Sequence, residues 1–359
     1  MKIHHFYPKT RNVGDHFVQR GIERMFRELV PHAAFDLYNV NSRGEDQTNY
    51  GLTRSTVERA NREADLVIIG GSNLYEGSYR WRWGVHLEPE ALDDLRVPLF
   101  LVGIGTGSNF LSRTHRPSAR ATKEIKLLND RAIFSGARDV LTRDWLHKLG
   151  VFKAELMGDP ATFIFNYPAQ RTVGGHVLIT TPPVRFWASK SRFWKVRQHG
   201  RAMFRATVSL ARNLLEKGYE VMVACNDPAD LSLAHDLFGE WFDGRIVCPG
   251  SPDDYFPLLS GARAVVTGRL HTAVASFSLG VPFVLIDADQ RTRGFVETYQ
   301  LDDWSVNPSQ DDFETRLKDK TDCLLSDDAS GSWELLIGKR DQMYTRGMSL
   351  LRDALGRVN

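Results

Sequence analysis

The sequence predicts an α/β fold with two Rossmann-like, doubly wound domains that face a cleft. Short apolar runs alternate with amphipathic stretches along the chain, and this alternation is typical of βαβ units around a mostly parallel sheet. The length of 359 residues exceeds the size at which a single hydrophobic core usually stops growing. Residues 166–175, which contain proline and glycine, divide the pattern into two similar halves. We therefore expect domains at residues 1–168 and 169–330, followed by a C-terminal helix at 331–359.

In the first half of the chain the strands are expected at short runs of apolar residues. The helices are expected where apolar side chains recur at intervals of three or four residues. The last helix should end before Gly150, because glycine is common just beyond a helix and Lys148 suits its final turn. The strands are expected at residues 2–6, 34–37, 66–69, 98–102 and 132–135, and the helices at 15–29, 55–63, 119–129 and 140–149.

The second half repeats this organisation. Gly218 should end its first helix. Residues 332–358 form a last helical stretch, because apolar side chains from Ile337 to Leu355 recur at helical spacing. The strands are expected at residues 176–179, 220–224, 245–247, 264–267 and 282–286, and the earlier helices at 201–217, 230–241, 272–279 and 293–300.

The composition is that of an ordinary globular protein, with 42% hydrophobic and 25% charged residues. The formal charge of +2 gives no reason to expect a nucleic-acid partner. Three scattered cysteines, Cys225, Cys248 and Cys323, argue against a disulfide framework and for a reducing compartment. They form no Cys/His cluster, so no metal site is expected. The sequence has neither a secretory h-region nor a run of ~20 apolar residues, so we expect a cytoplasmic, soluble protein.

The most informative segment contains Gly268, Arg269, Leu270 and His271, which follow an apolar run and open a helix. In open α/β sheets the carboxyl end of a strand and the start of the next helix form the usual ligand crevice. A guanidinium and an imidazole at this position suit an anionic substrate that needs proton transfer. The alternative is that Arg269 forms a surface salt bridge and that His271 caps the helix.

Two segments in the first half also follow strands. Asn12, Gly14 and Asp15 precede a helix, where Asp15 can cap the helix and Gly14 permits close approach of another group. A helix cap with no further role is the alternative. The turn from Gly70 to Asn73 has small residues whose backbone amides suit phosphate or sugar hydroxyls. The segment 103–108 lacks the third glycine of the dinucleotide fingerprint, so no nicotinamide cofactor is expected.

Two aspartates near strand ends complete the set of polar candidates. Arg138 lies between a strand and a helix and is a candidate second clamp for an anion, while Asp139 can cap the helix and hold the guanidinium. Asp159 precedes Pro160 and is another strand-end acid. A simple Asp-Pro turn is the alternative for Asp159.

Together these segments resemble the polysaccharide pyruvyl transferase family. The resemblance runs in the family's order from about residue 10 to residue 300, with Ser72 in place of a third glycine and Arg291 in place of a lysine. It implies a fold like the two-domain GT-B glycosyltransferases, with a C-terminal helix that packs back on the first domain. It is carried by residues 12–15, 65–73, 138–151, 159–160, 268–271, 279–282 and 291–295.

The resemblance implies transfer of pyruvate from phosphoenolpyruvate to a sugar of a bacterial polysaccharide or lipid-linked glycan, which forms a ketal and releases phosphate. Phosphoenolpyruvate is a substrate, and neither a cofactor nor a metal is implied. The second domain would hold the donor through Arg269, Leu270, His271 and Arg291, and Arg138 of the first domain would also contact it. His271 would donate a proton or assist the leaving phosphate, and Asp15, or else Asp159, would be the base. The acceptor would contact Asn12, Gly14, Gly71, Ser72, Asn73, Trp81 and Trp83 in the first domain.

Two segments rich in aromatic and basic residues, 75–83 and 185–195, suit sugar rings and acidic groups. The second also suits an anionic membrane surface, which would place the protein at the inner face of the membrane. The alternative is that the tryptophan and phenylalanine side chains form interdomain core, with the flanking charges in solvent. Two other functions stay open: a GT-B glycosyltransferase that uses a nucleotide sugar, and a non-catalytic glycan-binding relative that would tolerate loss of His271.

Overall fold

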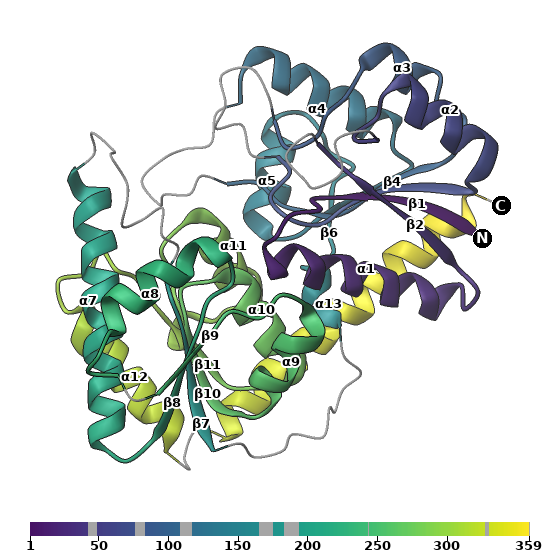
Figure 1. Cartoon of the computed structure of the whole chain (residues 1–359). Helices are drawn as coiled ribbons and strands as arrows, with labels where there is room; N and C mark the ends of the chain where they lie inside the picture. The colour runs from purple at the N-terminus through teal and green to yellow at the C-terminus, as the bar shows by residue number, and fades with distance from the viewer. Residues whose placement is uncertain are drawn as a thin grey trace. The chain divides into compact units, whose positions relative to one another are not determined.

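The computed structural model describes residues 1–41, 49–75, 83–107, 117–164, 175–182, 194–242, 244–326 and 330–358, with the backbone alone at 194–197 and 330–332. Its chain contacts divide it into two compact units (Figure 1). Unit 1 comprises Met1–Thr10, Asp15–Ile164 and Asp341–Asn359, and unit 2 comprises Arg11–Gly14 and Phe165–Arg340.

Unit 1 contains a six-stranded parallel sheet in the order β2-β1-β3-β4-β5-β6. The strands are β1 (Lys2–Tyr7), β2 (Ala34–Asn39), β3 (Leu66–Gly70), β4 (Leu99–Ile104), β5 (Phe134–Ala137) and β6 (Glu155–Leu156). The connecting helices are α1 (Val13–Leu29), α2 (Arg54–Glu63), α3 (Pro89–Asp93), α4 (Ala119–Arg131) and α5 (Val140–Lys148), with a 3-10 turn at Pro160–Phe163.

Helices cover both faces of this sheet, which explains why its central strands are apolar on both sides. One core cluster joins Val57 of α2, Leu92 of α3 and Ile125 of α4 to the strands. On the other side Phe26 of α1 contacts the ring of Phe100 on β4. Local capping reinforces the helices: Asp139 accepts a hydrogen bond of 2.7 Å from the amide of Thr142 at the start of α5.

The last helix, α13 (Ser330–Gly356), contributes its second part to unit 1 (Figure 1). Tyr344 donates a hydrogen bond to Glu28 at the end of α1. Arg346 donates from Nε to the carbonyl of Leu156 at 2.9 Å and forms an ion pair of 3.0 Å with Glu155. The expected packing of a terminal helix on the first domain is therefore confirmed.

Unit 2 contains a second six-stranded parallel sheet, in the order β12-β11-β10-β7-β8-β9 (Figure 1). The strands are β7 (His176–Thr180), β8 (Glu220–Ala224), β9 (Arg245–Val247), β10 (Ala262–Thr267), β11 (Phe283–Ile286) and β12 (Ser305–Val306). The helices are α7 (Trp194–Glu216), α8 (Leu231–Phe238), α9 (Pro252–Ser260), α10 (Leu270–Leu279), α11 (Gln290–Tyr299) and α12 (Phe313–Leu325), with short 3-10 turns at Pro228–Asp230 and Asp302–Trp304.

Each sheet reverses its strand order at one point. In unit 1 the reversal lies between β1 and β3, and in unit 2 it lies between β7 and β10. Doubly wound sheets bind ligands outside the carboxyl ends of their strands at such a switch point. The topology therefore directs attention to the residues after β1 and β3 in one unit and after β7 and β10 in the other.

The predicted α/β class with two doubly wound units is confirmed, and all ten expected strands are present. The edge strands β6 and β12 were not predicted, because two residues carry no periodic pattern. Helices α3, α9 and α12 were also missed, and Pro257 inside α9 is a residue that argues against a helix. The helix expected at 201–217 begins earlier, at Trp194. Within the described residues, no helix is long and apolar enough to cross a bilayer.

Candidate functional site

Arg269 lies at the switch point of unit 2, between the end of β10 and the start of α10. Its amide donates to Thr267 Oγ1 at 2.9 Å, and its Nε donates to the carbonyl of Thr181, just after β7, at 3.0 Å. Its Nη2 forms an ion pair with Asp230, whose side chain is only 2% exposed. The Arg269 side chain is 12% exposed, and its guanidinium is held across the ends of the two strands that flank the switch point. This arrangement differs from a surface salt bridge.

His271 is the second residue of α10, so it does not cap the helix; Arg269 occupies the cap position without a capping side chain. The imidazole packs against Gly14, which belongs to the same unit. A Cβ atom at residue 14 would lie 2.1 Å from Nδ1 of His271, so this position requires glycine. The sequence placed Gly14 with the acceptor, whereas the structure places it beside the predicted donor residue His271.

A buried polar network supports the start of α10. Asn226, which follows β8, donates from Nδ2 to Thr272 Oγ1 at 2.9 Å, and the hydroxyl of Tyr255 lies 3.0 Å from the same oxygen. Burial raises the pKa of Tyr255 well above its usual range, so the phenol stays protonated. The network fixes the residue next to His271, and Leu270 on the other side is buried. Asn226, Tyr255 and Asp230 were not predicted from the sequence, although Asn226 is a polar residue two positions beyond the end of β8.

A second arginine group lies beyond β11, the neighbour of β10. Asp289 caps α11 by accepting from the amides of Arg291 and Thr292, and it also pairs with the Arg291 guanidinium. Arg293 lies 3.3 Å from Asp287. Burial raises the pKa of Asp287 to about 6, against the opposing effects of the Thr292 hydroxyl and Arg293. The predicted donor residue Arg291 is therefore fixed by a carboxylate that the sequence analysis missed.

In unit 1, the switch point holds a carboxylate. Asp15 is 9% exposed and accepts hydrogen bonds from Thr10 Oγ1 at 2.6 Å and from Ser72 Oγ at 3.0 Å. Ser72 has the left-handed φ of 57°, which turns the chain after β3 toward Asp15. The structure therefore brings together two segments that the sequence analysis had considered separately.

The other predicted acceptor residues have local roles. Gly71 donates its amide to the carbonyl of Val102, and a Cβ there would lie 2.1 Å from Val18 Cγ1, so its glycine serves packing against α1. Asn12 accepts from the amide of Gly14 at 2.9 Å. Asn73 donates to the carbonyl of Gly107 at 3.3 Å. The amide of Gly71 is therefore not available to a ligand, contrary to the expectation for this turn.

Arg138 and Asp159 contact each other inside unit 1. The Arg138 side chain is 3% exposed, and its Nε lies 3.2 Å from Asp139 and 3.7 Å from Asp159. Gly105 packs against the guanidinium, where a Cβ would lie 2.4 Å from Cζ. Burial raises the pKa of Asp159 to about 6, although Arg138 opposes the shift. Arg138 Nη2 and Asp159 Oδ2 nevertheless have no hydrogen-bond partner among the described residues, and the roles of both side chains toward a ligand stay predictions.

Trp83 belongs to the hydrophobic core of unit 1. Its side chain is 4% exposed, stacks on Tyr75 with ring centroids 6.1 Å apart, and donates from Nε1 to Glu124 at 2.7 Å. This indole therefore has no exposed face on which a sugar ring could stack. Trp81 and residues 185–193 lie outside the described part of the chain.

The whole chain is similar in fold to several solved structures. The UDP-GlcNAc 2-epimerase of Neisseria meningitidis matches with a TM-score of 0.57 and 10% identity, over 99% of this chain and 100% of that chain. A glycosyltransferase from Rickettsia africae matches with a TM-score of 0.57 and 12% identity, over 99% of this chain and 97% of that chain. The UDP-GlcNAc 2-epimerase of Methanocaldococcus jannaschii matches with a TM-score of 0.52 and 12% identity, over 91% of this chain and 93% of that chain. These similarities support the expected GT-B-like architecture. At sequence identities of 10–12% they concern the fold alone.

The family assignment comes from the sequence. Comparison with curated proteins gives no match. The sequence profile of the polysaccharide pyruvyl transferase family, in contrast, matches residues 12–290, well over half of the chain. This range includes Asp15, Ser72, Arg138, Arg269 and His271. The chain is therefore a transferase that belongs to the polysaccharide pyruvyl transferase family.

Proposed function

We propose that the protein transfers pyruvate from phosphoenolpyruvate to a sugar residue of a bacterial surface polysaccharide or of its lipid-linked precursor. The product is a pyruvate ketal, and phosphate is released. The observation that carries the proposal is the fixed Arg269 guanidinium near His271 at the switch point of unit 2, within the range that matches the family. No cofactor is part of the proposal.

In this proposal unit 2 binds the donor. Phosphoenolpyruvate carries a carboxylate and a phosphate, and guanidinium groups bind both with paired hydrogen bonds. Arg269 and Arg291 are the candidates in unit 2, because each is partly exposed and held by a buried aspartate. The buried partner fixes the guanidinium before the donor arrives, which reduces the entropy lost on binding. Arg138, with a 3% exposed side chain already shared by two aspartates, is the weaker candidate.

The chemistry requires one proton donor and one base. Two sugar hydroxyls form two C–O bonds to C2 of the donor, C3 gains one proton, and the bond from C2 to the phosphate oxygen breaks. Of the two protons that the hydroxyls lose, one balances the proton gained by C3 and the other leaves with phosphate. An imidazole can donate a proton at neutral pH, so we assign the proton transfer to C3 to His271.

We assign the base to Asp15 of unit 1. Its carboxylate is oriented by the hydroxyls of Thr10 and Ser72 and lies at the switch point, where doubly wound sheets bind ligands. Asp159 is a poorer base toward a substrate, because it is 1% exposed and paired with Arg138. Unit 1 would thus hold the acceptor glycan, at the cytoplasmic face of the membrane if that glycan is lipid-linked.

A thermal-shift titration tests the donor. Phosphoenolpyruvate at about 100 times its dissociation constant should raise the unfolding free energy by about 2.7 kcal/mol. Arg269→Lys should lose most of this response, because lysine keeps a positive charge beside Asp230 but not the paired hydrogen bonds. Arg245→Lys, an exposed arginine on β9, is the matched control and should respond like the wild type.

The same titration with nucleotide sugars tests the alternative function, a glycosyltransferase. Stabilisation by a nucleotide sugar, with no response to phosphoenolpyruvate, would refute the proposal in favour of a glycosyltransferase. Release of phosphate from phosphoenolpyruvate in the presence of an acceptor glycan then tests transfer itself, and a non-catalytic relative would release none.

A further inference from the structure

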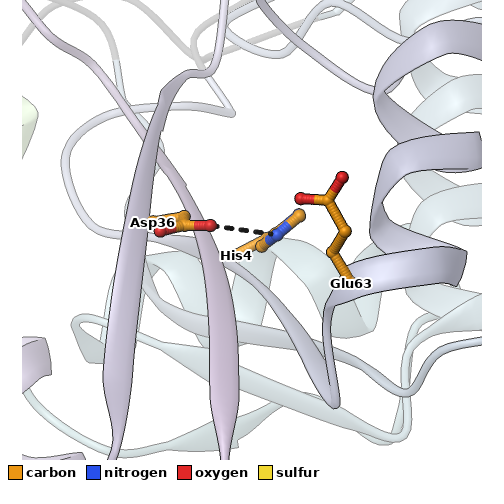
Figure 2. A group of neighbouring side chains, drawn as sticks. All are labelled: His4, Asp36 and Glu63. Carbon is orange, nitrogen blue, oxygen red and sulfur yellow. Dashed lines mark ion pairs between the residues drawn. The ribbon is translucent and has the colours of Figure 1, made fainter.

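Three side chains that the proposed function does not use converge at the opposite, amino-terminal edge of the sheet in unit 1 (Figure 2). His4 on β1 is the direct register partner of Asp36 on β2. Glu63 is the last residue of α2, which returns to this edge before β3. One possible ligand atom from each of the three residues lies within 4.8 Å of the other two.

The histidine is the unusual member of this cluster. Its side chain is 0% exposed, and neither ring nitrogen has a hydrogen-bond partner among the described residues. A buried polar group without a partner costs free energy, so its persistence calls for an explanation. Nε2 points toward Asp36, with 3.5 Å between Nε2 and Oδ2, and the carboxylate of Glu63 approaches from α2 (Figure 2).

The cluster can offer both ligands and access. A neutral imidazole has a nitrogen lone pair that a metal ion can bind. The side chains of Asp36 and Glu63 are 44% and 39% exposed, so a cation can reach the cluster from solvent.

The distance between the imidazole and the carboxylate also suits a small cation. Bonds of 2.0–2.2 Å from zinc to nitrogen and oxygen place two ligands of a tetrahedral site roughly 3.3–3.6 Å apart. The 3.5 Å between His4 Nε2 and Asp36 Oδ2 matches this separation. An imidazole with two carboxylates favours zinc or a similar transition metal over Mg²⁺ and Ca²⁺, which prefer oxygen ligands alone.

Lys2 provides the charge that such a cation would replace. Its ammonium lies 3.1 Å from Asp36 and 3.6 Å from Glu63, and these two carboxylates raise the pKa of Lys2. The side chain is 41% exposed and flexible, so it can leave the cluster without disturbing the core.

We propose that His4, Asp36 and Glu63 bind one divalent transition-metal cation, with Zn²⁺ the best match, and that Lys2 occupies the position between the carboxylates in its absence. Water completes the coordination. The site joins β1, β2 and α2 and lies at the opposite end of the strands from Asp15 and Ser72. Its expected effect is therefore on the stability of unit 1, independent of the proposed transfer reaction.

The test is calorimetric titration of the full-length protein, without a histidine tag, with Zn²⁺. Asp36→Asn and Glu63→Gln should each weaken binding by at least about tenfold, because each removes a ligand. Glu58→Gln, which removes an exposed carboxylate from the same helix, is the matched control and should bind like the wild type. Lys2→Met should bind Zn²⁺ more tightly, because it removes the competing ammonium.

Two further readouts locate the metal and separate this site from the transfer reaction. Zn²⁺ should raise the melting temperature of the wild type and of Glu58→Gln, but not that of Asp36→Asn. X-ray absorption at the zinc edge should show nitrogen and oxygen ligands without sulfur, since all three cysteines belong to unit 2. Equal affinities in the wild type, Asp36→Asn and Glu63→Gln, or sulfur ligation, would overturn the proposal. So would the absence of saturable binding to the wild type.

Discussion

The carboxyl edges of the two sheets use arginine–aspartate pairs in different ways. In unit 2 the side chains of Arg269 and Arg291 are 12% and 19% exposed, and each pairs with an aspartate that is 2% exposed. In unit 1 Arg138 is 3% exposed and lies between two buried aspartates. A buried carboxylate behind a partly exposed guanidinium orients that group for a ligand, whereas the guanidinium of Arg138 is enclosed with its two carboxylates. Its Nη2 has no hydrogen-bond partner among the described residues.

The same edges differ in the charge that they offer. Unit 2 places arginines and His271 beside its switch point, and unit 1 places the carboxylate of Asp15 between two hydroxyls. A cationic site suits an anionic donor, and an oriented carboxylate suits the removal of a proton from a sugar hydroxyl. Under the proposed function, unit 2 would therefore bind the donor and unit 1 would activate the acceptor.

The largest effect should come from the histidine of unit 2. We expect His271→Gln to lower kcat by about 10²–10⁴, because it removes the proposed proton donor while keeping a polar side chain. Gly14→Ala should have a similar effect, since its Cβ would displace the imidazole. Phosphate release at saturating phosphoenolpyruvate measures both. His235→Gln, an exposed histidine of α8, serves as the control, and turnover by His271→Gln at the control's rate would refute the role of His271.

Next in size is the loss of the buried arginine in unit 1. Arg138→Met should lower the free energy of unfolding by about 3–5 kcal/mol, because Asp139 and Asp159 would lose their buried partner. Urea unfolding measures this change. Arg143→Met, which removes a pair with Asp144 nearer the surface, should cost at most about 1 kcal/mol. A stable Arg138→Met variant that no longer responds to phosphoenolpyruvate would instead make Arg138 a donor ligand.

The pH dependence of stability tests the buried carboxyl group behind Arg138. Burial raises the pKa of Asp159 from 3.8 to about 6, so the folded protein binds this proton more tightly than the unfolded chain does. This group's contribution therefore falls by about 3 kcal/mol as the pH rises from about 4 to about 6, and is constant above that range.

Asp159→Asn should remove this slope while keeping an oxygen that accepts the amide of Ala161. The measurement is the difference in unfolding free energy between the wild type and the variant from pH 4 to pH 8. Asp144→Asn, at an exposed position, should leave the slope unchanged. Equal slopes in the wild type and Asp159→Asn would show that the carboxyl group titrates normally in the folded state.

The smallest effect should come from the hydroxyl that orients Asp15. Thr10→Val removes a hydrogen bond of 2.6 Å and should cost about 1 kcal/mol of stability. It should also lower kcat more than it changes KM for phosphoenolpyruvate, because it disturbs the base and not the donor site. Thr122→Val is the control, because it removes a hydroxyl that donates to the carbonyl of Ser118, the N-cap of α4 in the same unit. A change in KM alone would contradict the assignment of Asp15 to the acceptor side.

Much of the fold was predictable because its signals are local. Apolar runs located the ten longer strands, and the glycine after β10 directed attention to Arg269 and His271. The partners of Arg269 were not predictable, since Asp230 lies 39 residues away and Thr181 lies 88 residues away. The register that sets His4 beside Asp36 likewise depends on the pairing of β1 with β2.

By itself, the sequence determined the alternation of strands and helices, the division into two doubly wound halves and membership of the family, because each is written in local pattern or in the order of motifs. Arg138 and Arg269 look alike at that level, since each follows a strand and precedes a helix. Only the tertiary structure distinguished them, placing one between two buried aspartates and the other at a switch point. Burial and long-range pairing decide how a charged group behaves, and both arise when the strands assemble.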